Sequence, residues 1–500
     1  MSLIPAVDSS LEKYFWRWAG LLLALLLACS IAADLRDKMW ADELFTLYIA
    51  KQADIIKAIT EGCDNAPPLY AMLVRLILPA VGNEALAVRL PATLGFCCMF
   101  VCLLEFSRRR MPAALSFVTS LLACNALLAY SSMGRGYGIL LGASAGALLS
   151  WQSAAEGRRR GLSIASFAFC LAVMIAMHYY AIFFLGPLFL AELVRARASG
   201  KLDVGILAAM VPALLVLGIH YPLIAAASEF QLHFWSPAKP AAILSVYNHP
   251  FTCLFLSIYL IALVLRDISP NSAQLRSGSA QQRTPLHEWI ALGALTATPP
   301  FVVLVSMFTT HIFVERYVPW SVIGFALLMG MLLHKAVGRQ ASIAVLLLAA
   351  LMTLVAEREI VPLFRMPALR DGGKISRALA EVPAGSEPIV IPSAHAFMEL
   401  SYYAEPRLRE RLLYPASREL DLRYRGYDTD PLILVPLSRR TTLNVVDYQA
   451  LIAQHPRFLF SSSSGDYLLN LLLSSGYRVI PVDSGTAQPA LFEAEAPKIQ

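Results

Sequence analysis

Two adjacent carboxylates, Asp42 and Glu43, lie in a stretch rich in charged side chains that follows the first long apolar run of the chain. A carboxylate next to a membrane surface can act as a general base or hold a divalent cation. The same side chains can instead serve an amphipathic helix, because acidic groups stabilise the positive N-terminal end of a helix. The spacing alone therefore leaves a catalytic and a structural role open for this pair.

The composition indicates which elements must position these side chains. The chain has 500 residues, of which 57% are hydrophobic and 15% are charged, whereas about 25% are charged in ordinary soluble domains. A spanning helix needs ~20 largely apolar residues, and such runs recur along the chain. We predict eleven spans, at about 14–33, 87–107, 113–130, 137–155, 161–178, 180–194, 203–222, 250–266, 288–308, 317–334 and 341–356.

One further apolar run, 67–82, is short and carries Arg75 in its middle. An arginine at the bilayer centre costs roughly 2.5–3.5 kcal/mol, so we expect this helix to lie in the membrane interface. With a cytoplasmic N-terminus, the Arg clusters at 108–110 and 158–160 then fall in cytoplasmic loops, as the positive-inside rule requires. The first loop, 34–86, then faces the opposite side of the membrane.

The C-terminal residues, 357–500, have a different composition from the rest of the chain. Short apolar runs such as Pro388–Ile391 and Val479–Val482 alternate with polar stretches that have a helical pattern. Such alternation is typical of strands and helices in one domain. We therefore expect a small extracytoplasmic α/β domain after the last span.

The placement of charge also excludes some classes of protein. Transporters tend to carry ionisable residues near the midplane of their helices, whereas here these residues collect in loops at one membrane face. The Arg clusters are orientation signals rather than a nucleic-acid surface. The eight Cys form no CxxC pair and no Cys/His spacing typical of a metal site. This pattern favours chemistry at the membrane surface over passage through the bilayer.

Six short motifs, in order over about 300 residues, resemble those of the GT-C glycosyltransferases, which use polyprenyl-phosphate sugars. That family includes the bacterial aminoarabinose transferase of lipid A, the protein O-mannosyltransferases and the rhizobial lipopolysaccharide-core transferases. The motifs are Trp40-Ala41-Asp42-Glu43-Leu44-Phe45-Thr46, Asp64-Asn65-Ala66-Pro67-Pro68-Leu69-Tyr70, the run from Gly82 to Arg89-Leu90-Pro91, Tyr130-Ser131-Ser132-Met133-Gly134-Arg135-Gly136-Tyr137, His178-Tyr179-Tyr180 and Glu315-Arg316-Tyr317-Val318-Pro319.

The resemblance implies an inverting transfer in which Asp42 is the general base that acts on the acceptor hydroxyl. It implies that Glu43 orients the acceptor or binds a cation. Arg135 and Arg316, at the extracytoplasmic ends of spans, would stabilise the charge that grows on the departing phosphate. Contact with lipid headgroups is the structural alternative for both arginines.

The same motifs supply further candidates for substrate binding. Tyr137, His178 and Tyr317 are expected to line the substrate cavity, although interfacial aromatic residues also form the aromatic belt of membrane proteins. Asp64 and Asn65, which open the second motif, are the remaining candidates.

Two positions depart from the family pattern. Ala66 replaces the usual His before a Pro pair, and Met133 stands where many relatives have Glu. A different acceptor, independence from metal and loss of catalysis all remain open for this reason. A divalent cation is therefore left open as a cofactor.

We predict an all-α polytopic membrane domain of GT-C type at 1–356 and a small periplasmic α/β domain at 357–500. The resemblance implies a glycosyltransferase of a bacterial inner membrane that moves a sugar from a polyprenyl-phosphate donor to a glycan, lipid or protein acceptor. No nucleic-acid partner is expected. The alternatives are a transporter or flippase of a lipid-linked substrate and a catalytically inactive scaffold with the same architecture.

Overall fold

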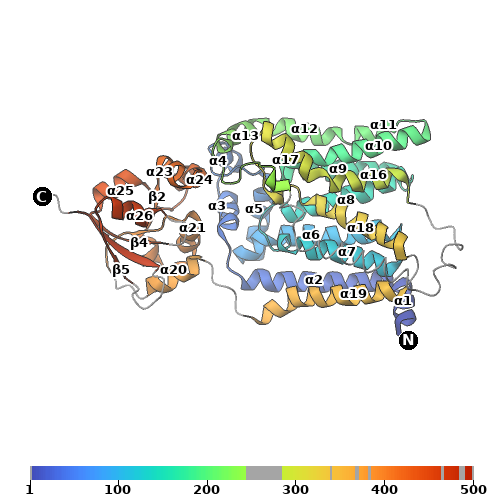
Figure 1. Ribbon diagram of the computed structural model, residues 1–500, viewed down its shortest axis with the longest axis horizontal. Coiled ribbons are helices and arrows are strands. Elements are labelled where there is room, and N and C mark those ends of the chain that lie inside the picture. The colour runs from blue at the N-terminus through green and yellow to red at the C-terminus, as the bar shows by residue number, and fades with distance from the viewer. Residues whose placement is uncertain are drawn as a thin grey trace.

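The computed structural model describes residues 3–243, 284–337, 341–365, 371–380, 385–462, 467–482 and 490–497. Helices that run side by side form an elongated bundle, and the C-terminal region lies at one end of it (Figure 1). The N-terminus lies at the opposite end of the bundle. The first loop between long helices lies where the bundle meets the C-terminal region.

The bundle consists of helices at the apolar runs that the sequence predicts, wherever the structure describes them. They are α1 (Leu3–Lys13), α2 (Phe15–Arg36), α6 (Glu84–Arg108), α7 (Ala113–Leu127), α8 (Tyr137–Ala155), α9 (Arg160–Met177), α10 (Leu185–Ser199), α11 (Val204–Ala208), α12 (Val211–Ile219), α13 (Tyr221–Ala226), α16 (Leu286–Thr296), α17 (Thr298–Phe308), α18 (Trp320–Val337) and α19 (Ala341–Val355). The run predicted at 250–266 lies outside the described residues.

Several of these helices have the length and composition of membrane spans. In the described part of the chain, 5 helices are long and apolar enough to cross a bilayer, or up to 7 if each bent helix pair counts as one span. The two bent pairs join Val204–Ile219 to Tyr221–Gln231 and Leu286–Thr296 to Thr298–Phe308, each with a bend of 49°. The chain is thus a multi-pass membrane protein, and the number of eleven spans stays a prediction.

Helices α6 and α8 pack closely against each other, and they position the two sequence motifs that contain Arg89 and Arg135. A Cβ atom added at Gly138 would collide with the backbone of Ala92, and one at Gly142 would collide with the backbone of Gly95. Small residues at such crossings let helix backbones approach closely. The crossing therefore holds the segment before α8, which carries Arg135, against the start of α6.

Three short helices form the first loop: α3 (Ala41–Ala50), α4 (Ile55–Thr60) and α5 (Leu69–Val81). Helix α5 is apolar but shorter than a span. Its Arg75 donates hydrogen bonds to the backbone carbonyls of Gln52 and Ala53, at 2.9 and 3.1 Å. These bonds give the guanidinium partners within the first loop, and the depth of α5 in the membrane stays a prediction.

The C-terminal region contains a six-stranded mixed sheet in the order β3-β2-β1-β4-β6-β5. β1 pairs in parallel with β2 and β4, β2 pairs in parallel with β3, and β6 runs antiparallel to β4 and β5. Its strands are β1 (Ile389–Val390), β2 (Leu412–Ala416), β3 (Val445–Asp447), β4 (Arg457–Ser461), β5 (Arg478–Pro481) and β6 (Leu491–Glu495). Its helices are α20 (Asp371–Ala380), α21 (Ala394–Tyr403), α22 (Pro406–Arg409), α23 (Arg418–Arg425), α24 (Thr429–Ser438), α25 (Tyr448–Gln454) and α26 (Leu468–Ser474). The central strand β1 is fully buried, as expected for a parallel strand covered on both faces.

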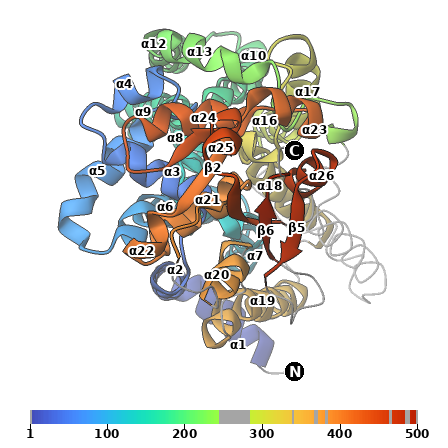
Figure 2. The ribbon, with the colours of Figure 1, turned by 90° about the vertical axis from the view of Figure 1, so that its left-hand side faces the viewer.

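Helix α21 joins the C-terminal region to the first loop, and Figure 2 shows it in front of the bundle near α6. The hydroxyl of Tyr403 accepts a hydrogen bond from the backbone N–H of Met39 at 2.8 Å. The hydroxyl of Tyr402 donates to Glu84 at 2.5 Å. The first contact holds the chain just before α3 and the second holds the start of α6, so the C-terminal region helps to position the helix that carries Asp42.

Candidate active site

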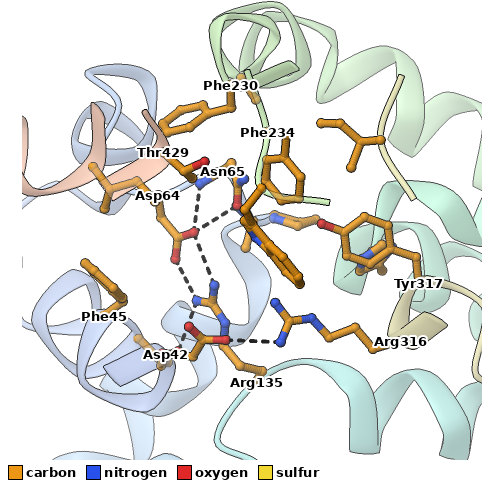
Figure 3. Close-up of a pocket in the computed structure, with 18 of the residues that line it drawn as sticks. Asp42, Phe45, Asp64, Asn65, Arg135, Phe230, Phe234, Arg316, Tyr317 and Thr429 are labelled. Carbon is orange, nitrogen blue, oxygen red and sulfur yellow. Dashed lines mark hydrogen bonds and ion pairs between the residues drawn. The ribbon is translucent and has the colours of Figure 1, made fainter. Parts of the chain in front are cut away.

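A cavity of about 890 Å³ lies where the bundle, the first loop and the C-terminal region meet. Every candidate named from the sequence lines this cavity, with the exception of Glu43. Figure 3 shows charged side chains at its centre and phenylalanines, among them Phe45, Phe230 and Phe234, around them. Pockets of this size with a few convergent polar groups are typical of substrate sites.

Asp42 lies in the first turn of α3, and its partly buried carboxylate faces the cavity. The Nη1 atom of Arg316 lies 3.4 Å from Oδ2 of Asp42, and the two side chains are 26% and 17% exposed. The Arg316 guanidinium also lies over the ring of Trp235, 5.8 Å from its centroid. The pairing is loose, so both groups can still interact with a substrate in the cavity.

Arg135 belongs to a second ion pair across the cavity (Figure 3). Its Nη1 atom donates to Oδ2 of Asp64 at 2.7 Å and lies 3.3 Å from the hydroxyl of Thr46. Oδ1 of Asp64 accepts from the backbone N–H groups of Asn65 and Ala66, at 2.7 and 3.1 Å. Asp64 therefore holds Arg135 in place at the cavity.

Aromatic rings surround His178 at the cavity. Its ring centroid lies 5.8 Å from that of Tyr137 and 4.7 Å from that of Tyr317. The Nδ1 atom of His178 accepts a hydrogen bond from the backbone N–H of Tyr180 at 3.3 Å. These contacts hold the imidazole among the rings that line the cavity.

Glu43 points away from this cavity, although it is the neighbour of Asp42 in the chain. Its carboxylate pairs with Arg89 at 2.7 Å, and the two side chains are 1% and 3% exposed. It also accepts hydrogen bonds from the backbone N–H groups of Gly134 and Trp40, at 2.8 and 3.2 Å. We therefore assign Glu43 a role in holding the site together rather than a place among the reacting groups.

The groups that line the cavity form a poor cation site. Across the described ranges, no three or more His, Cys, Asp or Glu side chains lie together in a way that could hold a metal ion. The carboxylates of Asp42 and Asp64 both face guanidinium groups, which compete with a cation for the same oxygens. Ala66, which stands in place of the family's His, lines the cavity without offering a ligand. We derive no step through a metal ion.

The sequence did not point to the residues that the C-terminal region contributes. His395, Tyr424, Arg425, Tyr427 and Asp430 line the cavity from the start of α21, the end of α23 and the start of α24. No motif or periodicity marks these residues, because they come together only when the sheet forms.

The fold of this chain, a bundle of apolar helices with a charged cavity beneath an α/β region, is similar to that of solved structures of low sequence identity. ArnT from Cupriavidus metallidurans bound to undecaprenyl phosphate aligns over 96% of this chain and 98% of that chain, with 13% sequence identity and a TM-score of 0.54. The Archaeoglobus fulgidus oligosaccharyltransferase in complex with Zn and sulfate aligns over 88% of this chain and 67% of that chain, with 9% identity and a TM-score of 0.42. No protein-family model and no curated protein sequence matches the chain.

Proposed function

We propose that this protein transfers a sugar from a polyprenyl-phosphate donor to an acceptor hydroxyl, with Asp42 as general base. The observation that carries the proposal is the cavity in which Asp42 lies beside Arg316 and close to Arg135. A carboxylate suits the acceptance of a proton, and guanidinium groups suit the binding of phosphate oxygens. The cavity thus combines the two kinds of group that this reaction needs.

The reaction is a single displacement at the anomeric carbon of the sugar. The acceptor oxygen forms a bond to that carbon while the bond between the carbon and the phosphate oxygen breaks. Asp42 takes the acceptor proton, and the bonding electron pair leaves with the polyprenyl phosphate. The configuration at the anomeric carbon is inverted, because the acceptor attacks from the face opposite the leaving group.

Arg316 and Arg135 are the groups that meet the phosphate in this proposal. Negative charge on the phosphate grows as the bond breaks, and preorganised cations stabilise it most when water is excluded. Arg316 lies on the side of Trp235, whereas Arg135 is held by Asp64. We assign Arg316 to the phosphate directly, and Arg135 to the phosphate or to the sugar hydroxyls beside it.

The apolar part of the cavity suits the lipid of the donor. Phe45, Phe230 and Phe234 lie at its edges (Figure 3), and the neighbouring ArnT structure contains undecaprenyl phosphate. We propose the same class of lipid carrier here, in a bacterial inner membrane, with the cavity on the periplasmic side. The arrangement of the Arg clusters supports this orientation through the positive-inside rule.

Release or transfer of sugar from a panel of synthetic polyprenyl-phosphate sugars tests the proposal, with purified full-length protein in lipid nanodiscs. We expect turnover of at least one donor by the wild type and loss of that turnover in Asp42→Asn. Asp37→Asn is the matched control, because Asp37 belongs to the same loop but does not line the large cavity. Folded wild-type protein that turns over no donor would instead favour the scaffold or flippase alternatives.

A further inference from the structure

The C-terminal region forms one wall of the large cavity, and this domain-side wall consists mostly of polar side chains. It comprises Ser393, Ala394, His395, Tyr424, Arg425, Tyr427, Thr429, Asp430 and Ile433. Elsewhere the lining of the cavity includes the apolar side chains of Phe45, Ile49, Ile224, Phe230 and Phe234. The two parts of the lining therefore suit different partners, because an acyl or polyprenyl chain prefers apolar side chains and a hydroxylated molecule polar ones.

Asp430, in the first turn of α24, is the carboxylate of the domain-side wall. Nη1 of Arg425 donates to Oδ2 of Asp430 at 3.0 Å. Within the described residues, no side chain or backbone group donates a hydrogen bond to Oδ1 of Asp430, and 22% of the side chain is exposed. Because Asp430 lines the cavity, this exposed part is available to a molecule inside it.

Arg425 fixes the position of Asp430 and has little surface left for a ligand. Its side chain is 10% exposed, lies 3.7 Å from Asp421 and donates to the carbonyl of Pro392 at 3.1 Å. Asp421, in contrast with Asp430, does not line the cavity. The carboxylate of Asp430 is therefore the charged group of this network that a substrate can reach.

Asp430 lines the same cavity as the proposed base, Asp42. The domain-side wall thus faces the cavity of the reacting groups rather than a separate pocket. Burial raises the pKa of Asp430, and the Arg425 guanidinium opposes this rise.

An aromatic ring, that of Tyr424, lies on the same wall as Asp430. Tyr424 stacks on Tyr467 with ring centroids 5.0 Å apart and planes at 12°, which holds the Tyr424 ring rigidly. Tyr424 is 45% exposed and lines the cavity. A carboxylate that accepts hydrogen bonds from hydroxyls, beside rings that contact apolar C–H faces, matches the surface of a sugar.

We propose that Asp430 is the acceptor-binding residue of this protein and that the acceptor is a hydroxyl-rich saccharide rather than an acyl chain or a peptide. The proposal rests on the proposed function, since it assigns the second substrate of the same reaction. Asp430 accepts hydrogen bonds from saccharide hydroxyls, Tyr424 contacts the face of the ring, and the hydroxyl to be glycosylated points toward Asp42. Asp430 takes no part in bond formation.

Binding to an array of defined oligosaccharides built from glucose, galactose, heptose and N-acetylglucosamine tests this assignment without any donor. Full-length protein in nanodiscs is the probe, and the strongest binder is then titrated free in solution. We expect Asp430→Asn to weaken its binding about 10- to 100-fold, because a hydrogen bond to a charged group is lost. Asp421→Asn and Glu419→Gln are matched controls outside the cavity and should change binding less than about twofold.

Thermal unfolding of each variant separates recognition from folding. Asp421→Asn also removes an ion pair of Arg425, so it measures the structural cost of disturbing this network. If Asp430→Asn fails to fold, Tyr427→Phe removes a hydroxyl from the same wall and should weaken binding about 3-fold or more. Equal saccharide binding by the wild type and a folded Asp430→Asn overturns the proposal.

Two further outcomes keep this proposal distinct from the proposed function. Acceptor-independent release of sugar from the donor by the wild type, and its absence in Asp42→Asn, reports on the transferase without any contribution from the acceptor. Saccharide binding that depends on Asp430, without turnover of any donor, would support the acceptor site and contradict the transferase. Wild-type protein that transfers sugar only to a peptide or to a long-chain lipid without saccharide would support the transferase and overturn the acceptor assignment.

Discussion

Changing the adjacent carboxylates Asp42 and Glu43 to their amides should have opposite effects. Asp42→Asn should lose activity and stay folded, whereas Glu43→Gln should lose stability first. For Asp42→Asn we expect loss of a general base, which costs ~10²–10⁴ in rate. The cost in stability should stay below about 1 kcal/mol, because the contact with Arg316 is a loose and partly exposed pair at 3.4 Å. This variant should be folded and inactive.

Glu43→Gln should damage the fold first. The two carboxylate oxygens of Glu43 accept from Arg89 and from the backbone N–H groups of Gly134 and Trp40. A glutamine amide in either orientation would turn an N–H group toward one of these donors, and the Arg89 charge would lose its partner. Breaking a buried pair in this way costs roughly 3–5 kcal/mol.

Thermal unfolding in nanodiscs and donor turnover, measured on the same preparations, separate these two outcomes. We expect Asp42→Asn to unfold close to the wild-type temperature and Glu43→Gln to unfold well below it. Turnover by Glu43→Gln, corrected for the folded fraction, should remain within about tenfold of wild type. A stable but inactive Glu43→Gln protein would refute the positioning role and restore Glu43 to the reacting groups.

Two further changes test other parts of the protein. Arg316→Met should lower kcat/KM for the donor by about 10²–10³ with little change in unfolding temperature, because a cation near the leaving phosphate is lost; an effect below threefold would contradict this role. Gly138→Ala should destabilise the protein by about 1–3 kcal/mol in thermal unfolding, because the added methyl group would collide with the Ala92 backbone. Gly186→Ala is the control and should not destabilise the protein, because there is open space around the Cβ position of Gly186.

Much of the bundle follows from local sequence. Apolar runs of span length predict helices directly, and α6 begins at Asn83, whose side chain accepts from the backbone N–H of Leu86 at 2.9 Å. Arg75 in the middle of a short apolar run indicated an interfacial helix, and the structure gives that arginine backbone carbonyls as partners. These features depend on residues close together in the chain.

The different positions of the Asp42 and Glu43 side chains could not be predicted from the sequence. Neighbouring residues on a helix point about 100° apart, so one side chain faces the large cavity and the other faces α6. The partner of Glu43, Arg89, is 46 positions further along the chain. The sequence shows that the two carboxylates are adjacent but not that their side chains have different surroundings.

The residues of the domain-side wall could not be predicted from the sequence for a related reason. Asp430 and Tyr424 lie more than 300 residues from Asp42 and belong to no motif of the bundle. Their approach to the cavity depends on the sheet order and on the docking of α21 through Tyr403. Such contacts can be found only once the tertiary structure is known.

Two separate segments of the chain line the large cavity. Residues before 320 supply Asp42 and the arginines, and residues after 390 supply the domain-side wall. Apart from Tyr402 and Tyr403, which contact Glu84 and Met39, residues of the later segment can change without disturbing the ion pair of Glu43 and Arg89 beside Asp42. The two parts of the site can therefore diverge at different rates in evolution. Related proteins could then keep the same proposed reaction and differ in the acceptor that receives the sugar.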